Sequence, residues 1–316
     1  MQPVDKVNSK PEKIFFTHYG DEWIRGSERC LLDLVTHIDR EQFEPVVWCN
    51  AETMADEVKK LNVPVIHDAF PLMFGWQSPR FSFGGLRRLI RKGNEIVAEH
   101  DIQLLHANSG APSQWLNFVS RSKNLPLVAH LHSRYPLRDR ISLGLHHVSM
   151  AVGVSDPVVE QLIQDGMDEN KTHIIPNGID TSRLLQQKEV DLRNQLGISD
   201  NCFVIGTVAS LIKRKGVDLI LSALYQLLEK GVPARLVVIG DGPERQNLLR
   251  QAMDLGMQER VYFLGDQDNV VGLLRSGIDL FVSGAREEVF GLVLAEAGLA
   301  GLPVVAPKVG GIPGVI

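Results

Sequence analysis

Glu288-Val-Phe-Gly-Leu-Val-Leu-Ala-Glu296 places two carboxylates on either side of a Phe-Gly turn. The apolar run Asp279-Leu-Phe-Val-Ser283 before it predicts a strand, and Leu292 to Ala300 predict a helix. A helix that begins at a glycine presents unpaired N–H groups and the positive end of its dipole, which favour a bound phosphate. The stretch therefore predicts a seat for a diphosphate, with one carboxylate placed to hold a sugar and the other a ribose.

The rest of the chain alternates short apolar runs with amphipathic stretches such as 27–38 and 217–230. Apolar strands separated by helices predict parallel sheets covered on both faces. The runs are too many for one doubly wound sheet, so we predict an α/β fold of two Rossmann-like domains, residues 1–171 and 172–316, facing a central cleft. The strand runs are 13–19, 45–50, 64–68, 103–109, 126–132, 150–155, 173–177, 203–209, 235–240, 261–265, 279–284 and 303–308.

Polar residues follow several of these runs, where ligands bind in such sheets. Glu28, Asn108, His132 and Lys215 are among them, together with Glu288. We expect these side chains to line the cleft.

The composition is that of an ordinary globular protein, with 44% hydrophobic and 22% charged residues among 316. No apolar run approaches the roughly 20 residues of a membrane span, and the first residues carry no apolar segment of a secretory signal. The cysteines at 30, 49 and 202 are scattered and odd in number, which is typical of reduced thiols. We therefore expect a cytoplasmic protein. Its net charge of −5 disfavours nucleic-acid binding.

One basic cluster stands out against this acidic balance. Arg80, Arg87, Arg88, Arg91 and Lys92 occur with no acidic residue between them. Such a cluster at the start of an amphipathic helix predicts a peripheral contact with anionic lipid at the inner face of a membrane. A solvated helix face explains the same pattern equally well, and both interpretations stay open.

Several motifs occur in order along nearly the whole chain, and together they resemble the retaining glycosyltransferases of family 4, which have the GT-B fold. The resemblance implies transfer of a sugar, with its anomeric configuration retained, from a nucleotide-diphospho-sugar to a hydroxyl acceptor. It implies a glycan or lipid-linked acceptor, as in polysaccharide or lipopolysaccharide biosynthesis. The motifs are Arg25-Gly-Ser-Glu-Arg29, Pro126-Leu-Val-Ala-His-Leu-His132, Ile175-Pro-Asn-Gly-Ile-Asp180, Arg214-Lys-Gly-Val-Asp218, Val238-Ile-Gly-Asp-Gly-Pro-Glu-Arg245, Val261-Tyr-Phe-Leu-Gly265, the Glu288 to Glu296 stretch and Gly301-Leu-Pro-Val-Val305.

The resemblance implies three catalytic residues. Glu288 would contact hydroxyls of the donor sugar, and Lys215 would neutralise the departing phosphate. His132 would border the sugar and help to bind donor or acceptor. Considered without the family, Lys215 also fits a solvated residue at a turn, and His132 also fits a buried core histidine.

The resemblance also implies the donor-binding residues. Glu296 would hold the ribose hydroxyls, and Arg214 would share the diphosphate charge with Lys215. The backbone would approach the diphosphate at Gly26, Phe290, Gly291 and Leu292.

Neither a metal ion nor an organic cofactor is expected. Asp266-Gln-Asp268 has the spacing of a metal-binding pair, but no third ligand accompanies it, and we interpret it as a polar loop. Gly240-Asp-Gly242 lacks the third glycine of a dinucleotide fingerprint, which argues against NAD.

The chain departs from the family pattern in several places, one of which is the Gly310-Gly-Ile-Pro-Gly314 loop, with glycine where glutamate is usual. Two of these departures, Ser210 and the end of the chain, leave an alternative open. Ser210 stands where the family usually carries an arginine, and Arg25 stands where it usually carries a glycine. Family members also continue beyond the position of Ile316, so we expect the second domain to be incomplete. The alternative is a catalytically weak or inactive nucleotide-sugar-binding module. An enzyme of the sugar-nucleotide 2-epimerase kind is a further candidate on the same fold, but it needs an acid/base pair acting on the sugar ring, and the sequence shows no such pair.

Overall fold

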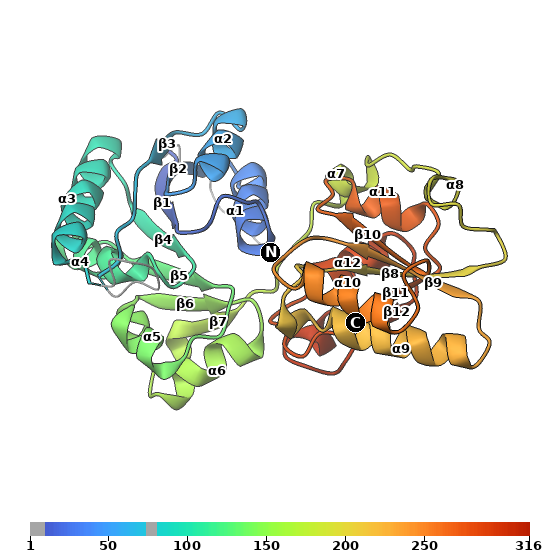
Figure 1. Cartoon of the computed structure of the whole chain (residues 1–316). Coiled ribbons are helices and arrows are strands. Elements are labelled where there is room, and N and C mark those ends of the chain that lie inside the picture. Colours follow the sequence, from blue (N-terminus) through green and yellow to red (C-terminus); the bar gives the residue numbers. More distant parts are fainter. Residues whose placement is uncertain (1–9, 74–80) are drawn as a thin grey trace, which may run out of the picture. The chain divides into compact units, whose positions relative to one another are not determined.

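The computed structural model describes residues 10–73 and 81–316. The chain forms two compact units, Met1–Gly178 and Ile179–Ile316. Figure 1 shows that each is a sheet flanked by helices. The boundary predicted after residue 171 is too early, because β7 (Thr172–Ile174) pairs in parallel with β6 (Met150–Gly153) and so belongs to the first sheet.

The first unit contains a seven-stranded parallel sheet in the order β3-β2-β1-β4-β5-β6-β7. The order reverses between β1 and β4, which is where ligands bind in doubly wound sheets. Its other strands are β1 (Glu12–His18), β2 (Phe43–Cys49), β3 (Val65–His67), β4 (Leu104–Asn108) and β5 (Leu127–Leu131). Its helices are α1 (Gly26–His37), α2 (Glu52–Lys60), α3 (Phe83–His100), α4 (Ser113–Lys123), α5 (Leu137–Ser142) and α6 (Asp156–Gln164).

Strand β1 shows why this sheet is covered on both faces. Successive side chains of a strand point to opposite faces. Ile14 and Phe16 belong to the buried cluster that includes residues of α1 and α2. Phe15 stacks on Trp48, whose ring meets Trp115 of α4 edge to face. The predicted parallel sheet with helices on both sides is confirmed in this unit.

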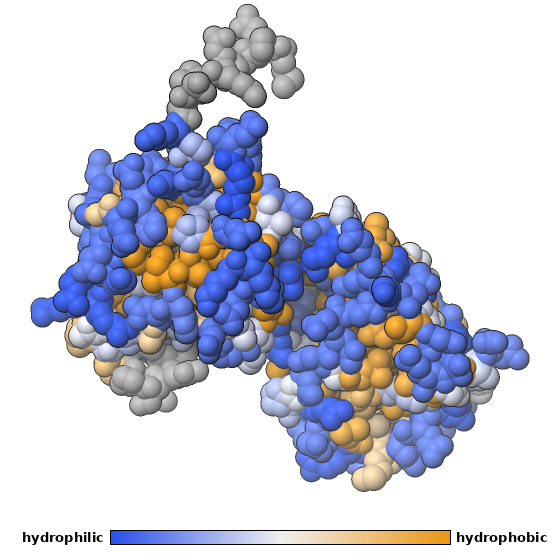
Figure 2. All heavy atoms as spheres, turned by 90° about the horizontal axis from the view of Figure 1, so that it is seen from above, coloured by the Kyte–Doolittle hydropathy of each residue, from blue (hydrophilic) through white to orange (hydrophobic). Residues whose placement is uncertain are grey.

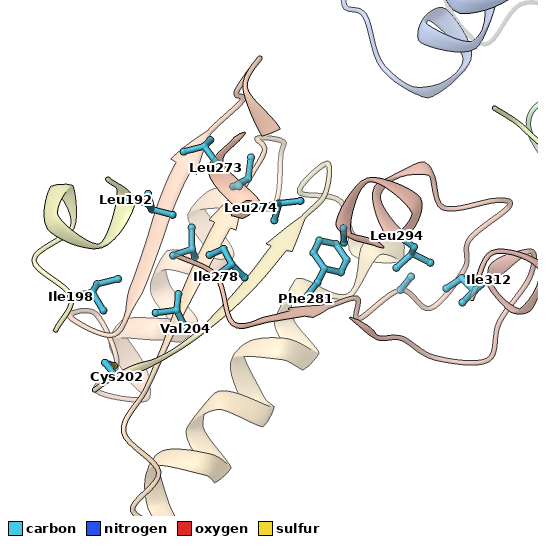
Figure 3. Packing of buried hydrophobic residues seen from close by; sticks show 14 residues of the cluster. Leu192, Ile198, Cys202, Val204, Leu273, Leu274, Ile278, Phe281, Leu294 and Ile312 are labelled. Atoms are coloured by element: carbon cyan, nitrogen blue, oxygen red, sulfur yellow. The ribbon is translucent and has the colours of Figure 1, made fainter. Parts of the chain in front are cut away.

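The second unit contains a five-stranded parallel sheet in the order β10-β9-β8-β11-β12. Its core on one face joins Phe281 of the sheet to Leu294 of α12 and to Ile312 (Figure 3). Its strands are β8 (Phe203–Val208), β9 (Ala234–Ile239), β10 (Val261–Gly265), β11 (Leu280–Val282) and β12 (Val304–Val305). Its helices are α7 (Thr181–Leu185), α8 (Leu192–Gln195), α9 (Val217–Glu229), α10 (Arg245–Asp254), α11 (Val270–Arg275) and α12 (Leu292–Leu299).

The strand order of the second unit reverses between β8 and β11. The loop after β8 carries Lys215 in a 3₁₀ turn, Lys213–Lys215, and the loop after β11 carries Glu288. Both loops leave the carboxyl ends of neighbouring strands, because β8 and β11 pair in parallel. The topology therefore brings the two predicted catalytic residues of this unit to one place.

The two loops meet through two glycines. Gly216 has a φ of +63°, and a Cβ there would lie 1.8 Å from the carbonyl oxygen of Gly284. A Cβ on Gly284 would lie 2.2 Å from the carbonyl oxygen of Gly216. Any larger side chain at either position would push the loops apart.

The surface is mainly hydrophilic in the view of Figure 2, with apolar patches on both units. Within residues 10–73 and 81–316, no helix combines the length and apolar character needed to cross a membrane.

We predict that Gly216→Ala destabilises the chain more than Gly197→Ala. Gly197 has nearly the same φ, +62°, but a Cβ at this residue would meet no other atom within 4 Å. The Gly197 variant therefore reports the cost of the left-handed backbone alone, about 1 kcal/mol. The clash at Gly216 should add about 1 to 3 kcal/mol in urea unfolding. Equal losses in the two variants would contradict the close contact with Gly284.

Candidate active site

Lys215 and Glu288 form an ion pair at the reversal point of the second sheet. The Lys215 ammonium donates to one carboxylate oxygen of Glu288, and the other oxygen accepts a 3.0 Å hydrogen bond from the N–H of Val289. The two side chains are only 18% and 11% exposed. The family resemblance implied separate roles for them, one at the phosphate and one at the sugar; the structure brings them into direct contact.

Arg286 connects the two loops that carry this pair. Its guanidinium donates two 2.7 Å hydrogen bonds to Asp218, in the first turn of α9, and one of 3.0 Å to the carbonyl of Lys213. Its backbone N–H donates to the carbonyl of Arg214 at 2.8 Å. The hydrogen bonds from Arg286 lower the pKa of the Asp218 carboxyl. Arg286 was not predicted as a site residue, because nothing in its local sequence indicates that it reaches back to α9.

Glu288 is also held from a third direction. Its carbonyl accepts a 3.0 Å hydrogen bond from Gly311, and a Cβ on Gly310 would lie 1.7 Å from the same carbonyl oxygen. Glycine at residue 310 therefore lets the backbone approach Glu288 closely. Lys215 and the N–H of Val289 thus hold the carboxylate, and the loop at Gly310 holds the backbone of the same residue.

Helix α12 begins directly after this carboxylate. Gly291 precedes it with a φ of +97°, and the carbonyl of Gly291 accepts from the N–H of Leu294 at 2.9 Å. The first N–H groups of a helix have no partner inside the helix, and they carry the positive end of its dipole. The predicted turn and helix are present, and the helix start lies next in sequence to the Lys215–Glu288 pair.

The other predicted donor residues of this unit take different positions. Arg214 is exposed beside Lys215, and Phe290 and Leu292 are partly buried next to Gly291. Glu296 lies within α12 and is partly exposed. None of these positions by itself identifies a bound group, so their donor contacts remain predictions.

In the first unit, His132 and Gly26 belong to one polar cluster at the ends of β1, β4 and β5. The Nε2 atom of His132 lies 3.0 Å from Oδ1 of Asn108. Nδ2 of Asn108 lies 2.9 Å from Nδ1 of His18, and Nε2 of His18 lies 3.1 Å from Glu28. Glu28 follows Gly26 in the first turn of α1, where Gly26 itself is exposed. His18 was not predicted as a site residue, because its place at the end of a buried strand gives no local signal.

Two further histidines belong to this cluster, because the ring of His130 packs against those of His132 and His106. Burial sets the charge of the cluster. It lowers the pKa of His106 to about 3 and that of His130 to about 4. Burial and the neighbouring histidines hold the pKa of His132 well below 6.5. Burial would raise the pKa of Glu28, but its interaction with His18 and its backbone hydrogen bonds outweigh burial, and the net pKa is lowered. At neutral pH the cluster therefore contains neutral His106, His130 and His132 and an ionised Glu28.

The predicted membrane segment is described from Phe81 onward; Arg80 lies outside the described residues. Phe81 and Phe83 are 64% and 66% exposed at the start of α3.

The basic side chains of this segment differ in their contacts. Arg88 donates to Asp68 and to the carbonyl of Ala69, whereas Arg87 is exposed. Arg91 and Lys92 continue the basic stretch one turn further along the helix. The segment is thus an exposed helix start with aromatic and basic side chains.

Two family models match the chain almost end to end. Residues 24–183 match the model described as Glycosyltransferase Family 4, and residues 188–316 match Glycosyl transferases group 1. The chain belongs to glycosyltransferase family 4. The predicted family resemblance and the GT-B fold class are confirmed.

Three similar proteins agree with this family. N-acetyl-alpha-D-glucosaminyl L-malate synthase of Bacillus anthracis is 28% identical over 72% of this chain and 62% of its own length. Alpha-monoglucosyldiacylglycerol synthase of Streptococcus pneumoniae is 24% identical over 74% of this chain and 57% of its own. The crystal structure of Anabaena HepE in complex with UDP and glucose has a TM-score of 0.78 and 26% identity, covering 96% of this chain and 83% of HepE. The chain thus matches less than two thirds of the length of these two curated relatives.

Proposed function

We propose that this chain transfers a sugar from a nucleotide-diphospho-sugar to a hydroxyl acceptor, with retention of the anomeric configuration. The Lys215–Glu288 pair, held beside the start of α12 at the reversal point of the sheet, is the observation that carries the proposal. A UDP-sugar is the donor to test first, because HepE, which shares the fold at 26% identity, has been crystallised with UDP and glucose.

In the proposed reaction the diphosphate takes the place that Glu288 occupies next to Lys215. Lys215 then neutralises the phosphate oxygen as the bond between it and the anomeric carbon breaks, and the electron pair of that bond stays on the diphosphate. The positive end of the α12 dipole, at the start of the helix, also stabilises the negative charge on the diphosphate. Because Lys215 is largely buried, its attraction for phosphate is stronger than it would be in bulk water.

Glu288, released from Lys215, accepts hydrogen bonds from hydroxyls of the donor sugar. The acceptor hydroxyl attacks the anomeric carbon on the face from which the diphosphate departs, and its proton passes to a diphosphate oxygen. A new carbon–oxygen bond replaces the one that breaks, on the same face, so the configuration is retained. The proposal includes neither a metal ion nor an organic cofactor.

For the acceptor we propose a glycan or a lipid-linked glycan. One similar protein is a monoglucosyldiacylglycerol synthase, which its name describes as making a glycolipid. The exposed phenylalanines and arginines at the start of α3 suit a contact with an anionic lipid surface. This contact would hold the chain at the cytoplasmic face of a membrane.

The alternative is a module that binds a nucleotide-sugar with little or no turnover. Ser210 favours it, because serine cannot supply the charge of the usual arginine on the diphosphate. Donor binding without sugar transfer would support this alternative.

We predict that Lys215→Ala weakens donor binding and slows transfer. The loss of a charged hydrogen bond to phosphate should reduce affinity about 10- to 100-fold, as measured by titration calorimetry with UDP-glucose. Lys213→Ala is the matched control, because it removes the same charge from an exposed side chain in the same turn. Unchanged binding and turnover in the Lys215 variant would eliminate the proposed role.

We also predict that the chain sediments with vesicles that contain anionic lipid and not with zwitterionic vesicles. Replacing Arg87 and Arg91 by Gln should reduce this binding at least about tenfold, since each basic residue near such a surface contributes about 1 kcal/mol. Replacing Lys59 and Lys60 of α2 by Gln makes the same charge change elsewhere on the first unit and should have little effect. Binding that is absent, or that the two double variants reduce equally, would count against α3 as the contact.

A further inference from the structure

The polar cluster of the first unit contains three side chains that are almost fully removed from solvent. His18 and Asn108 are 0% exposed and Glu28 is 5% exposed. Burying polar groups costs free energy unless each is hydrogen-bonded, and an apolar core would fill the space at lower cost. Packing alone therefore does not explain these residues, and their role follows from the groups with which they form hydrogen bonds.

The orientation of the Asn108 amide follows from its partners. Nδ2 of Asn108 lies 3.1 Å from the carbonyl oxygen of Ser27 and 2.9 Å from Nδ1 of His18. A backbone carbonyl only accepts hydrogen bonds, so the amide nitrogen must face Ser27. The amide oxygen consequently faces His132.

The orientation of the Asn108 amide determines which ring nitrogen of His132 carries the hydrogen. An amide oxygen only accepts, and it lies 3.0 Å from Nε2 of His132, so Nε2 must carry the hydrogen. The same reasoning applies to His18, whose Nε2 lies 3.1 Å from the ionised carboxylate of Glu28. Nδ1 of His18 lies next to two groups of Asn108, the amide nitrogen at 2.9 Å and the backbone carbonyl oxygen at 3.2 Å. Close polar contacts thus link His132 to Glu28 through Asn108 and His18.

Glu28 ties the other end of this chain to the backbone around Gly26. Its carboxylate accepts from the N–H of Arg25 at 3.2 Å and from the hydroxyl of Ser27 at 3.2 Å. Asn108 holds the carbonyl of Ser27 as well. The residues on both sides of Gly26 are thus bound to the network that orients His132.

The backbone next to Asn108 shows that this geometry is imposed by its surroundings. Ser109 has a φ of +105°, which residues other than glycine rarely adopt. Its N–H donates to the carbonyl of His130 at 2.8 Å. Such strain persists only where the surrounding contacts outweigh it, and it is concentrated at functional sites.

We infer that Glu28, His18 and Asn108 are positioning residues that hold the loop at Gly26 and the ring of His132 as one unit, with the hydrogen of His132 on Nε2. This inference rests on the proposed function for its purpose, since the family resemblance assigns Gly26 to the donor phosphates and His132 to the donor or the acceptor. The arrangement itself is a property of the chain without any ligand. It can therefore be tested separately from activity.

Long-range ¹H–¹⁵N spectra of the histidine rings test the proton position directly. In the full chain labelled with ¹⁵N-histidine, with His132→Gln to assign the signal, His132 should be neutral at pH 7.5 with its hydrogen on Nε2. Asn108→Ala should release this hydrogen to exchange with solvent. Thr17→Val is the matched control, because Thr17 precedes His18 in β1, is buried, and its hydroxyl has no partner among the described residues.

Hydrogen on Nδ1 of His132 would overturn the inference, and so would a ring signal that Asn108→Ala leaves unchanged. The wild-type spectrum alone decides the proton position if the variant is unstable. A chain without transfer activity but with the expected spectrum would contradict the proposed function and leave the positioning intact.

A double-mutant cycle tests whether Asn108 acts through His132. Asn108→Ala should lower kcat/KM for a UDP-sugar about 10-fold or more in the wild-type background, and should cause little further loss in His132→Gln. A purely structural role would give losses that multiply in the double variant. Multiplying losses would therefore contradict the assignment of Asn108 as a positioning residue.

Discussion

The contact between the loop after β8 and the loop after β11 is the constraint on which the candidate active site depends. Gly216 and Gly284 let the two backbones meet, and Arg286 fastens one loop to Asp218 at the start of α9. The Arg286–Asp218 pair is exposed, and such a pair adds little stability on its own. It matters here because it holds together the loops that carry Lys215 and Glu288.

The ion pair between Lys215 and Glu288 gives the unliganded site a neutral, hydrogen-bonded state. A largely buried ammonium without a partner would be costly, and Glu288 removes that cost. A phosphate group can replace the carboxylate next to Lys215 without leaving the ammonium unpaired. In the proposed reaction, donor binding thus exchanges one ion pair for another and frees Glu288 for the sugar.

The fold was predictable because parallel strands buried on both faces leave continuous apolar runs between amphipathic helices. The domain boundary was placed too early because β7 is short, and its pairing with β6 depends on tertiary structure. Glu288 and Lys215 were each predicted, but not their contact, since they lie 73 residues apart in sequence. Arg286 and His18 were missed for the same reason: their roles come from residues distant in the chain.

A crystal structure of the chain with UDP-glucose would test the central claim most directly. The account predicts that the diphosphate lies against the Lys215 ammonium and the first N–H groups of α12, with Glu288 turned from Lys215 toward the sugar hydroxyls. A donor bound elsewhere, with the Lys215–Glu288 pair still closed, would contradict it.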